Sequence, residues 1–308
     1  MIHVICLNPA IDTFYEIDGF AAGEDYPGLR ARRVNGGKGV NVARVLCQLG
    51  EKPVLHAYLG DGAKALEQEM RGLCTCDFYE VPGVCRTTIN ILDRANGRET
   101  VITEAGPTIA KAHVNQLMYT LEDEIAKGDI VVCSGSIISG GPADFYARIS
   151  RLCAQVGAKC VLDCNAKTLP ESLKDAQYAL GKPNERELCA LLGAERTQNS
   201  EEIVRLARKL MPPYDALLVS MGAAGGVYVT RDAAVFSPGA QVKVQSTVGS
   251  GDACLAGAVY AMAHGYDMEE TLRLAMACGA ANAKRAETGI DSREDVLWLA
   301  KSIQVSAS

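Results

Sequence analysis

The sequence of 308 residues predicts an α/β protein with a mostly parallel central sheet, helices on both of its faces and a second, small β-sheet. From about residue 110 onward, short apolar runs alternate with helix-length segments, a rhythm typical of parallel sheets. Before that point, β-branched runs at 86–92 and 99–103 flank an Asn96-Gly97 pair, which indicates a hairpin. Together with an alternating run at 11–20, this hairpin predicts the small sheet.

Each element of the main body follows from its local pattern. Strands are expected where apolar residues stand together and a turn residue follows, at 3–7, 52–59, 129–134, 159–164, 178–181, 216–220, 227–230 and 241–245. Helices are expected where apolar residues recur at helical spacing, at 40–49, 63–73, 112–127, 143–156, 185–192, 200–209, 255–264, 268–285 and 293–301. Ligands of such sheets lie beyond the carboxyl ends of the strands. Polar strand ends at 134–136, 163–165, 182–187 and 220–226 therefore mark the candidate site.

Composition and charge exclude several classes of protein. A net charge of −6 argues against a nucleic-acid partner, and no apolar run is long enough to span a membrane. The twelve cysteines include no C-x-x-C pair and the four histidines are scattered, so no zinc site is expected. No targeting segment is recognised, and we expect a cytoplasmic protein with reduced thiols.

The stretch 246–257 combines features that suit an anion site. Two glycines, Gly249 and Gly251, flank Ser250, and Asp252 follows before a segment with helical spacing. As strand, turn and helix, this stretch would present the backbone N–H groups of Ser250, Gly251 and Asp252 at a helix N-terminus, where anions bind. Asp252 would repel phosphate, which leaves two interpretations: an N-cap on an ordinary turn, or a general base for an attacking hydroxyl.

A second glycine-rich turn opens the helix at 40–49. Gly36, Gly37 and Lys38 precede it in a pattern that is not a Walker A loop, and Asn41 lies in the first helical turn. Glycines, a lysine and a helix N-terminus make a polar pocket that tolerates anions, and the Asn41 amide could bind sugar hydroxyls. Asp12 follows a strand end, where it is either a ligand-binding residue or a turn carboxylate.

Two further segments suit a nucleotide and its metal. Asn184 and Glu187 are three residues apart on one predicted helix face and could hold the water shell of Mg²⁺. The small residues at 222–226 would let a flat base lie against the backbone. Together with the two glycine-rich turns, these features predict phosphoryl transfer from ATP to a small hydroxylated molecule.

Four motifs resemble those of the ribokinase-like carbohydrate kinases, in the branch that holds 1-phosphofructokinase and tagatose-6-phosphate kinase. They are Leu7-Asn8-Pro9-Ala10-Ile11-Asp12, the run from Gly36 to Arg44, the run from Lys182 to Glu187, and the run from Thr247 to Asp252. Their order and spacing cover nearly the whole chain. The resemblance implies one domain over 1–308, with a discontinuous β lid from about 11–35 and 85–104.

The resemblance also implies a role for individual residues. Asp252 would be the catalytic base, and the turn formed by Gly249, Ser250, Gly251 and Asp252 would be the anion hole. The sugar would be bound by Asp12, Gly36, Gly37, Lys38 and Asn41, with Arg86 on its phosphate unless Arg86 is only a solvated strand charge. ATP would contact Lys182, Asn184, Ser220, Gly222, Gly225, Thr247 and Asn282, and Mg²⁺ would be held by Asn184 and Glu187 through water.

Two positions depart from the branch and bear on the acceptor. Pro27 stands where an arginine is expected, and Ile138 stands where the branch usually has proline. The leading hypothesis is an ATP- and Mg²⁺-dependent kinase that converts fructose 1-phosphate to fructose 1,6-bisphosphate, with 271–275 and 289–293 favouring that acceptor. The segment 104–107 favours tagatose-6-phosphate kinase instead. An unphosphorylated sugar or nucleoside as acceptor, a non-catalytic sugar-phosphate sensor and a homodimer through the lid are further hypotheses.

Overall fold

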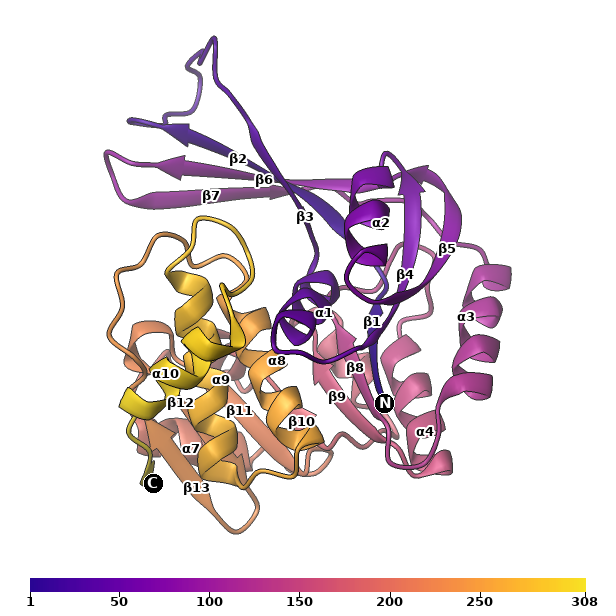
Figure 1. Ribbon diagram of the computed structural model, residues 1–308, viewed down its shortest axis with the longest axis vertical. Coiled ribbons are helices and arrows are strands. Elements are labelled where there is room, and N and C mark those ends of the chain that lie inside the picture. The colour runs from indigo at the N-terminus through magenta and orange to yellow at the C-terminus, as the bar shows by residue number, and fades with distance from the viewer.

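The computed structural model describes residues 1–308 and places a large sheet with helices on both faces beside a smaller sheet (Figure 1). The large sheet has the strand order β14-β13-β12-β11-β10-β9-β8-β1-β4-β5. Pairing is parallel from β5 to β11 and antiparallel from β11 to β14. The strands are β1 (Ile2–Cys6), β4 (Val54–Asp61), β5 (Thr75–Val84), β8 (Ile130–Ser134), β9 (Lys159–Asp163), β10 (Leu180–Gly181), β11 (Ala216–Ser220), β12 (Gly226–Thr230), β13 (Ala234–Ser237) and β14 (Ser306–Ala307). The predicted fold class is confirmed.

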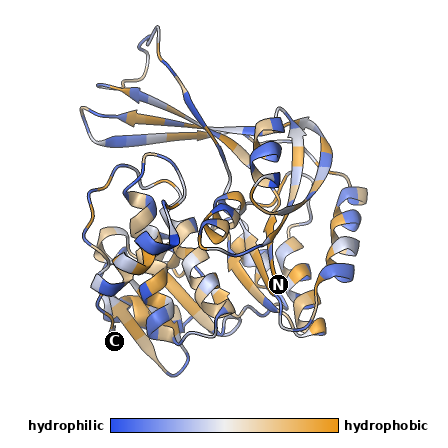
Figure 2. Cartoon of the chain, in the orientation of Figure 1, coloured by the Kyte–Doolittle hydropathy of each residue, from blue (hydrophilic) through white to orange (hydrophobic).

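The helices divide between the two faces of this sheet. One face is covered by α1 (Lys38–Gln48), α2 (Lys64–Arg71), α8 (Ser250–Ala263), α9 (Met268–Ala283) and α10 (Arg293–Ser302). The other is covered by α3 (Lys111–Glu124), α4 (Phe145–Val156), α5 (Leu169–Ser172), α6 (Glu185–Leu191) and α7 (Ser200–Arg208). Alternate residues of β1 enter separate apolar clusters, Val4 on the first face and Ile5 on the second. Both faces are therefore cores, and Figure 2 shows the central strands as mainly apolar.

The smaller sheet consists of β3 (Arg32–Gly36), β2 (Ala10–Ile17), β6 (Arg86–Asp93) and β7 (Arg98–Thr103), in that order. It projects from the main body where the chain leaves β1 (Figure 1). β6 and β7 form the predicted hairpin, with the expected glycine, Gly97, at a φ of 59° in the turn. All six residues of β7 are exposed, so this edge strand is uncovered.

The structure differs from the sequence-based prediction at several elements. No strand forms at 241–245, because the antiparallel edge of the large sheet is occupied by β13 and β14. The segment instead runs as a loop along the end of α9, where Gln245 N donates to the Ala283 carbonyl at 2.8 Å. The helix that follows begins at Ser250, which agrees with the helix N-terminus predicted at 250–252 and extends the predicted range 255–264 by one turn. β3, β5, β13 and β14 were not predicted; β5 contains Pro82, which the edge position of that strand tolerates.

None of the helices combines the length and the apolar character that crossing a membrane requires.

Candidate active site

The first turn of α8 presents a buried carboxylate beside unpaired backbone donors. Gly249, left-handed with a φ of 76°, occupies the N-cap position and turns the preceding loop into the helix. The N–H of Ser250 is hydrogen-bonded within this turn at 3.2 Å, whereas the N–H groups of Gly251 and Asp252 donate to no group of the protein. Two of the three predicted amides are thus open to an anion at a helix N-terminus.

Asp252 is held by one amide and surrounded by charged groups. Asn41, in the first turn of α1, donates from Nδ2 to Asp252 Oδ2 at 2.8 Å. Burial raises the pKa of Asp252 to about 6, although the charge of Lys38 acts in the opposite direction. An ordinary N-cap role is wrong for Asp252, because Gly249 holds that position and Asp252 is the third residue of the helix. A buried carboxylate that titrates near neutrality is suited to accept a proton.

Asp163, at the end of β9, connects the lysines of two predicted motifs. Lys38 Nζ lies 2.9 Å from Asp163 Oδ1, and Lys182 Nζ lies 3.6 Å from Oδ2. Burial alone would raise the pKa of Asp163, but the two lysines hold it below its ordinary value. Burial alone would likewise lower the pKa of Lys38, but the carboxylates of Asp163, Asp252 and Glu187 raise it. Lys38 therefore remains a half-buried cation next to Asp252.

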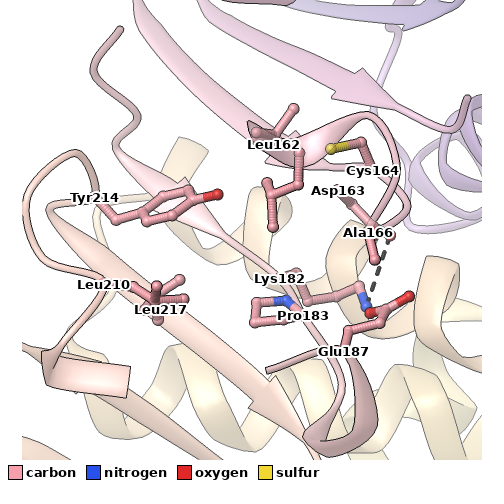
Figure 3. A pocket seen from close by; sticks show the side chains of 11 residues that line it. Leu162, Asp163, Cys164, Ala166, Lys182, Pro183, Glu187, Leu210, Tyr214 and Leu217 are labelled. Atoms are coloured by element: carbon pink, nitrogen blue, oxygen red, sulfur yellow. Dashed lines mark ion pairs between the residues drawn. The ribbon is translucent and has the colours of Figure 1, made fainter. Parts of the chain in front are cut away.

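The predicted metal-binding pair forms a reciprocal cap at the start of α6. Asn184 Oδ1 accepts from the Glu187 N–H at 2.8 Å, and Glu187 Oε2 accepts from the Asn184 N–H at 2.9 Å. Figure 3 shows Glu187 and Lys182 among the side chains that line one small cavity. The cavity that they line with Asp163 has a volume of about 20 Å³, which is room for one water.

The donor set of this region suits Mg²⁺. Glu187 keeps one carboxylate oxygen outside the capping hydrogen bonds, and Asp163 Oδ2 is buried without a hydrogen-bond partner. Carboxylate and amide oxygens are the ligands that Mg²⁺ accepts, and it usually keeps several of its waters. The capping bonds fix the orientation of both predicted ligands, so Asn184 and Glu187 can hold such an ion through water.

The small sheet brings Asp12 to the same region. Asp12 lies on β2 and is buried, and burial raises the pKa of its carboxyl to about 6. Gly36 pairs with β2 at the end of β3, and a Cβ at this position would overlap the Asp12 carboxylate. Gly37 has a φ of 101° and would contact the Pro9 backbone if it had a side chain. These glycines let the small sheet and α1 approach each other.

Arg86 begins β6 and is fixed at the end of β1. Its Nη2 and Nε donate to the Asn8 carbonyl at 2.8 Å and 3.1 Å, which leaves Nη1 without a hydrogen-bond partner in the protein. Gly106 packs against the Arg86 side chain. The guanidinium is therefore held in one orientation and keeps a free donor. This arrangement favours a ligand-binding role for Arg86 over that of a solvated charge on a strand.

The predicted nucleotide residues lie beyond the ends of β10 and β11. Ser220, the last residue of β11, pairs with Asn184 in an isolated parallel bridge. Gly222 begins a short 3₁₀ turn with a φ of 59°, and open space surrounds the position its Cβ would take. Gly225 is required for packing, because a Cβ there would overlap the Ser237 carbonyl.

Asn282 and Thr247 lie at the turn before α8. Asn282 Nδ2 donates to the Val248 carbonyl at 2.8 Å and to Ser250 Oγ at 3.0 Å, and its Oδ1 accepts from the Gly289 N–H at 2.8 Å. These bonds occupy the Asn282 amide and leave it 1% exposed. In this structure Asn282 therefore holds the turn and does not face a nucleotide. The Thr247 carbonyl closes the same turn by accepting from Ser250.

Arg44 forms a buried network behind Asn41 that was not predicted. Its Nη1 donates to Asn41 Oδ1 at 2.8 Å, and its Nε donates to Glu69 of α2 at 2.8 Å. Its Nη2 donates to the Asn35 carbonyl of β3, and Asn35 Nδ2 in turn donates to Glu69 at 2.7 Å. Arg44 thus links the amide that holds Asp252 to the small sheet.

A sequence model described as pfkB family carbohydrate kinase matches residues 4–295. The chain belongs to this family. The family resemblance and fold expected from the sequence are thereby confirmed, as is carbohydrate kinase activity as a class. PfkB kinases use ATP, typically with Mg²⁺, which agrees with the oxygen donors at the start of α6.

Solved structures agree with this membership. A protein from Staphylococcus aureus assigned as a phosphofructokinase is 27% identical, with a TM-score of 0.79, over 100% of this chain and 99% of that one. A protein from Thermotoga maritima assigned as a 1-phosphofructokinase is 25% identical, with a TM-score of 0.85, over 100% of this chain and 99% of that one. Phosphofructokinase-2 from Escherichia coli is 24% identical, with a TM-score of 0.88, over 98% of each chain. Another structure of that enzyme is a tetrameric inhibited form.

Two site residues of this pfkB kinase escaped the sequence-based prediction in different ways. Asp163 stood at one of the polar strand ends, so its position gave a signal, but no chemistry was assigned to it. Arg44 lies within a recognised motif, yet nothing in its surroundings in the sequence indicates Glu69 or Asn35 as partners. Its role depends on tertiary contacts among α1, α2 and β3.

Proposed function

We propose that the protein is an ATP- and Mg²⁺-dependent kinase of a ketohexose phosphate that converts fructose 1-phosphate to fructose 1,6-bisphosphate. The observation that carries this proposal is the buried Asp252 carboxylate in the first turn of α8, beside two unpaired N–H groups and the Lys38 cation. Such a turn can hold phosphate oxygens and a proton acceptor within one short stretch. A sensor that only bound its ligand would have no use for that carboxylate.

In the proposed reaction, Asp252 accepts the proton of the attacking hydroxyl. The new bond joins that hydroxyl oxygen to the γ-phosphorus of ATP while the bond to the leaving oxygen of ADP breaks. The hydrogen bond from Asn41 orients the carboxylate, and the N–H groups of Gly251 and Asp252 stabilise the charge on the transferred group, with Ser250 and Gly249 shaping the turn. Lys38 adds a fixed positive charge beside them.

The ATP side is assigned to residues that follow β10, β11 and the turn before α8. These are Lys182, Asn184, Ser220, Gly222, Gly225 and Thr247, with Asn282 acting through the turn that it holds. When bound, Mg²⁺ neutralises charge on the nucleotide phosphates. Asn184 and Glu187 would hold its water shell, and their capping bonds would keep both side chains in place.

The acceptor is assigned to the small sheet and to α1. Asp12, Gly36, Gly37, Lys38 and Asn41 would contact the sugar. Arg86 would bind its phosphate through the free Nη1 donor, which is supported by the two bonds that fix its orientation. A guanidinium held this way favours a phosphorylated acceptor over a free sugar.

The departures from the branch bear differently on the acceptor. Pro27 lies in the exposed loop between β2 and β3, beside the equally exposed Arg30. Ile138 is 2% exposed and packs within the apolar cluster on the α3 and α4 face. Isoleucine in place of proline therefore affects the packing of this core and adds no group to the acceptor pocket. The Glu104 side chain accepts from the Thr87 N–H at 2.7 Å, next to Arg86. The 104–107 segment therefore lies beside the residue proposed to bind the acceptor phosphate. Because this segment resembles tagatose-6-phosphate kinases, tagatose 6-phosphate is the second candidate.

The single domain over 1–308, with the small sheet from about 11–35 and 85–104 as a lid over the sugar, is part of the same proposal. The exposed edge strand β7 would pair with a second copy of the chain, because an uncovered edge is a template for strand pairing. Val101 and Ile102 on this strand are 53% and 52% exposed, which supports such a contact. A cytoplasmic location is part of the same proposal, supported by twelve cysteines that form no disulfide.

The experiment that tests the function measures ADP release with fructose 1-phosphate, tagatose 6-phosphate, fructose 6-phosphate, ribose and adenosine as acceptors. The proposal predicts the highest kcat/KM with fructose 1-phosphate. A higher value with tagatose 6-phosphate would make the second candidate correct. No turnover on any acceptor, together with retained ligand binding, would contradict a kinase and favour the sensor.

A further inference from the structure

Two of the four histidines meet inside the protein, although 53 residues separate them in the sequence. His3 lies on β1 and His56 on β4, which pair in parallel with Ile5 opposite His56. Both side chains therefore point to the face that α3 covers (Figure 1), and they are 1% and 0% exposed. They lie in the amino-terminal halves of their strands, whereas the candidate active site lies beyond the carboxyl ends. No step of the proposed kinase mechanism uses either imidazole.

The two imidazoles and one carboxylate form a compact set of ligand atoms. His3 Nδ1 lies 3.1 Å from His56 Nε2, and the rings are stacked with centroids 5.4 Å apart. Glu124, the last residue of α3, places Oε2 3.7 Å from His56 Nε2, and the three ligand atoms all lie within 4.8 Å of one another. Tetrahedral Zn²⁺ with bonds of about 2.0–2.2 Å requires separations of about 3.4 Å between its ligands. The partly exposed Glu124 side chain can adjust to that separation.

The outer nitrogens of both rings face carboxylates. His3 Nε2 lies 3.6 Å from Asp129 Oδ2, and His56 Nδ1 lies 3.6 Å from Asp77 Oδ2. Both nitrogens are buried without a hydrogen-bond partner. Two neutral imidazoles have two N–H groups, and the hydrogen bond between the rings uses one of them. Only one of the two carboxylates can therefore accept a hydrogen bond from a ring. A cation on the two inner nitrogens would turn both N–H groups outward, the usual carboxylate–histidine–metal arrangement.

The local charge also favours a divalent cation. Asp77, Glu124 and Asp129 surround two imidazoles, and the carboxyl end of α3 adds partial negative charge. The N-terminal ammonium of Met1 pairs with Asp129, so the three carboxylates and this one cation leave a net negative charge around the rings. A metal ion binds the neutral rings and does not require them to be protonated.

We propose that His3, His56 and Glu124 bind a Zn²⁺ ion, with Asp129 and Asp77 as outer carboxylates that orient the two rings. The fourth position of the tetrahedron is left to water, on the side where Glu124 and Asp77 are partly exposed. The ion joins β1 and β4 to the end of α3 and so stabilises the α3 face of the sheet. This proposal is independent of the proposed kinase reaction.

The test titrates Zn²⁺ into the chelator-treated full-length protein and measures stoichiometry, affinity and Tm. We expect one tight site per chain and a Tm that rises with zinc. Glu124→Gln should weaken binding by about tenfold or more, since it removes a charged ligand, and should leave kinase turnover unchanged. Glu122→Gln, two residues earlier on the same helix and also exposed, is the matched control and should bind zinc like the wild type.

Cobalt distinguishes this site from the cysteines and from the active site. Co²⁺ in place of zinc should give a visible spectrum of tetrahedral nitrogen and oxygen ligation, and His3→Gln should abolish that spectrum while Glu187→Gln retains it. Because His3 is buried, its variant is interpreted together with Glu124→Gln, whose side chain is partly exposed. Equal zinc affinity in Glu124→Gln and wild type, a thiolate-to-cobalt band, or no zinc binding by the wild type would each overturn the proposal.

Discussion

Asp252 and Asp12 are the two buried carboxylates whose pKa burial raises to about 6. If Asp252 is the base, it must be ionised to accept a proton, so kcat/KM should fall as the pH drops below about 6. In Asp12→Asn, KM for the sugar phosphate should rise while the fall below about pH 6 persists. Rates across the pH range with both enzymes test this. A profile that becomes flat in Asp12→Asn would assign the titration to Asp12.

The same raised pKa has a consequence for stability. A carboxyl whose pKa is higher in the folded protein than in the unfolded chain favours the protonated form on folding. The free energy of unfolding contributed by Asp252 therefore decreases as the pH rises from about 4 to about 6, and above that range the buried charge lowers stability. Catalysis and stability thus make opposite demands on this residue.

Arg86 is the residue whose orientation is most directly linked to the acceptor phosphate. Arg86→Ala should raise KM for the sugar phosphate by about a hundredfold, since charge-assisted hydrogen bonds to phosphate are strong, and should change KM for a free sugar little. Initial rates with both acceptors measure the difference. Arg94→Ala is the control, because Arg94 lies at the far end of β6 and pairs only with the exposed Glu16. Equal effects of Arg86→Ala on both acceptors would contradict the phosphate contact.

Among the elements, α1 connects the small sheet to α8 through one side chain. Arg44→Met should release Asn41 from its fixed orientation and remove the donors of Glu69 Oε1 and of the Asn35 carbonyl, while Asn35 Nδ2 still donates to Glu69 Oε2. We expect the free energy of unfolding to fall by about 2 kcal/mol and kcat to fall about tenfold, with the binding of ADP retained. Urea unfolding and steady-state kinetics test both.

Arg71→Met is the comparison for that variant. Arg71 pairs with Glu67 on α2 and donates from Nη1 to the Cys76 carbonyl at 3.3 Å, but neither partner contacts Asn41. Its loss should therefore lower the free energy of unfolding by about 1 kcal/mol and leave kcat unaltered. If Arg44→Met behaved like Arg71→Met in both measurements, the network would not position the base.

Elements with strong local patterns were predicted and the others were not. The hairpin of β6 and β7 follows from its Asn-Gly turn and alternation, and α1 follows from glycines, helical spacing and the final Gly50. The run 241–245 alternates like a strand but forms none, because tertiary structure gives the sheet edge to β13 and β14. The local sequence pattern does not determine which of several short β-like segments pairs at the edge of the sheet.

The site shows the same division at the scale of single residues. Lys38, Asn41, Lys182 and Asp252 were predicted from their motifs, and the structure brings them together around Asp163. Their proximity arises because parallel strands bring their carboxyl ends to one edge of the sheet. The hydrogen bonds that occupy Asn282 could not be foreseen, since the turn it holds is defined only in the folded protein.

For the whole molecule, the small sheet leaves one long edge uncovered. If two chains pair through β7, Ile102→Lys should convert a dimer to a monomer in sedimentation velocity, because a charge would be buried at the contact. Tyr119→Lys, at an exposed position on α3, should leave the dimer intact. A wild-type monomer, or a dimer that Ile102→Lys does not affect, would contradict the pairing.

The central claim is that Asp252 accepts the proton of the acceptor hydroxyl, and the turnover of Asp252→Asn tests it most directly. We predict that kcat falls by about a thousandfold or more, while ADP binds as in the wild type and the free energy of unfolding at neutral pH is unchanged or higher. Retained binding and folding would exclude a structural cause for the loss. A kcat within about tenfold of the wild type would remove Asp252 from the role of base.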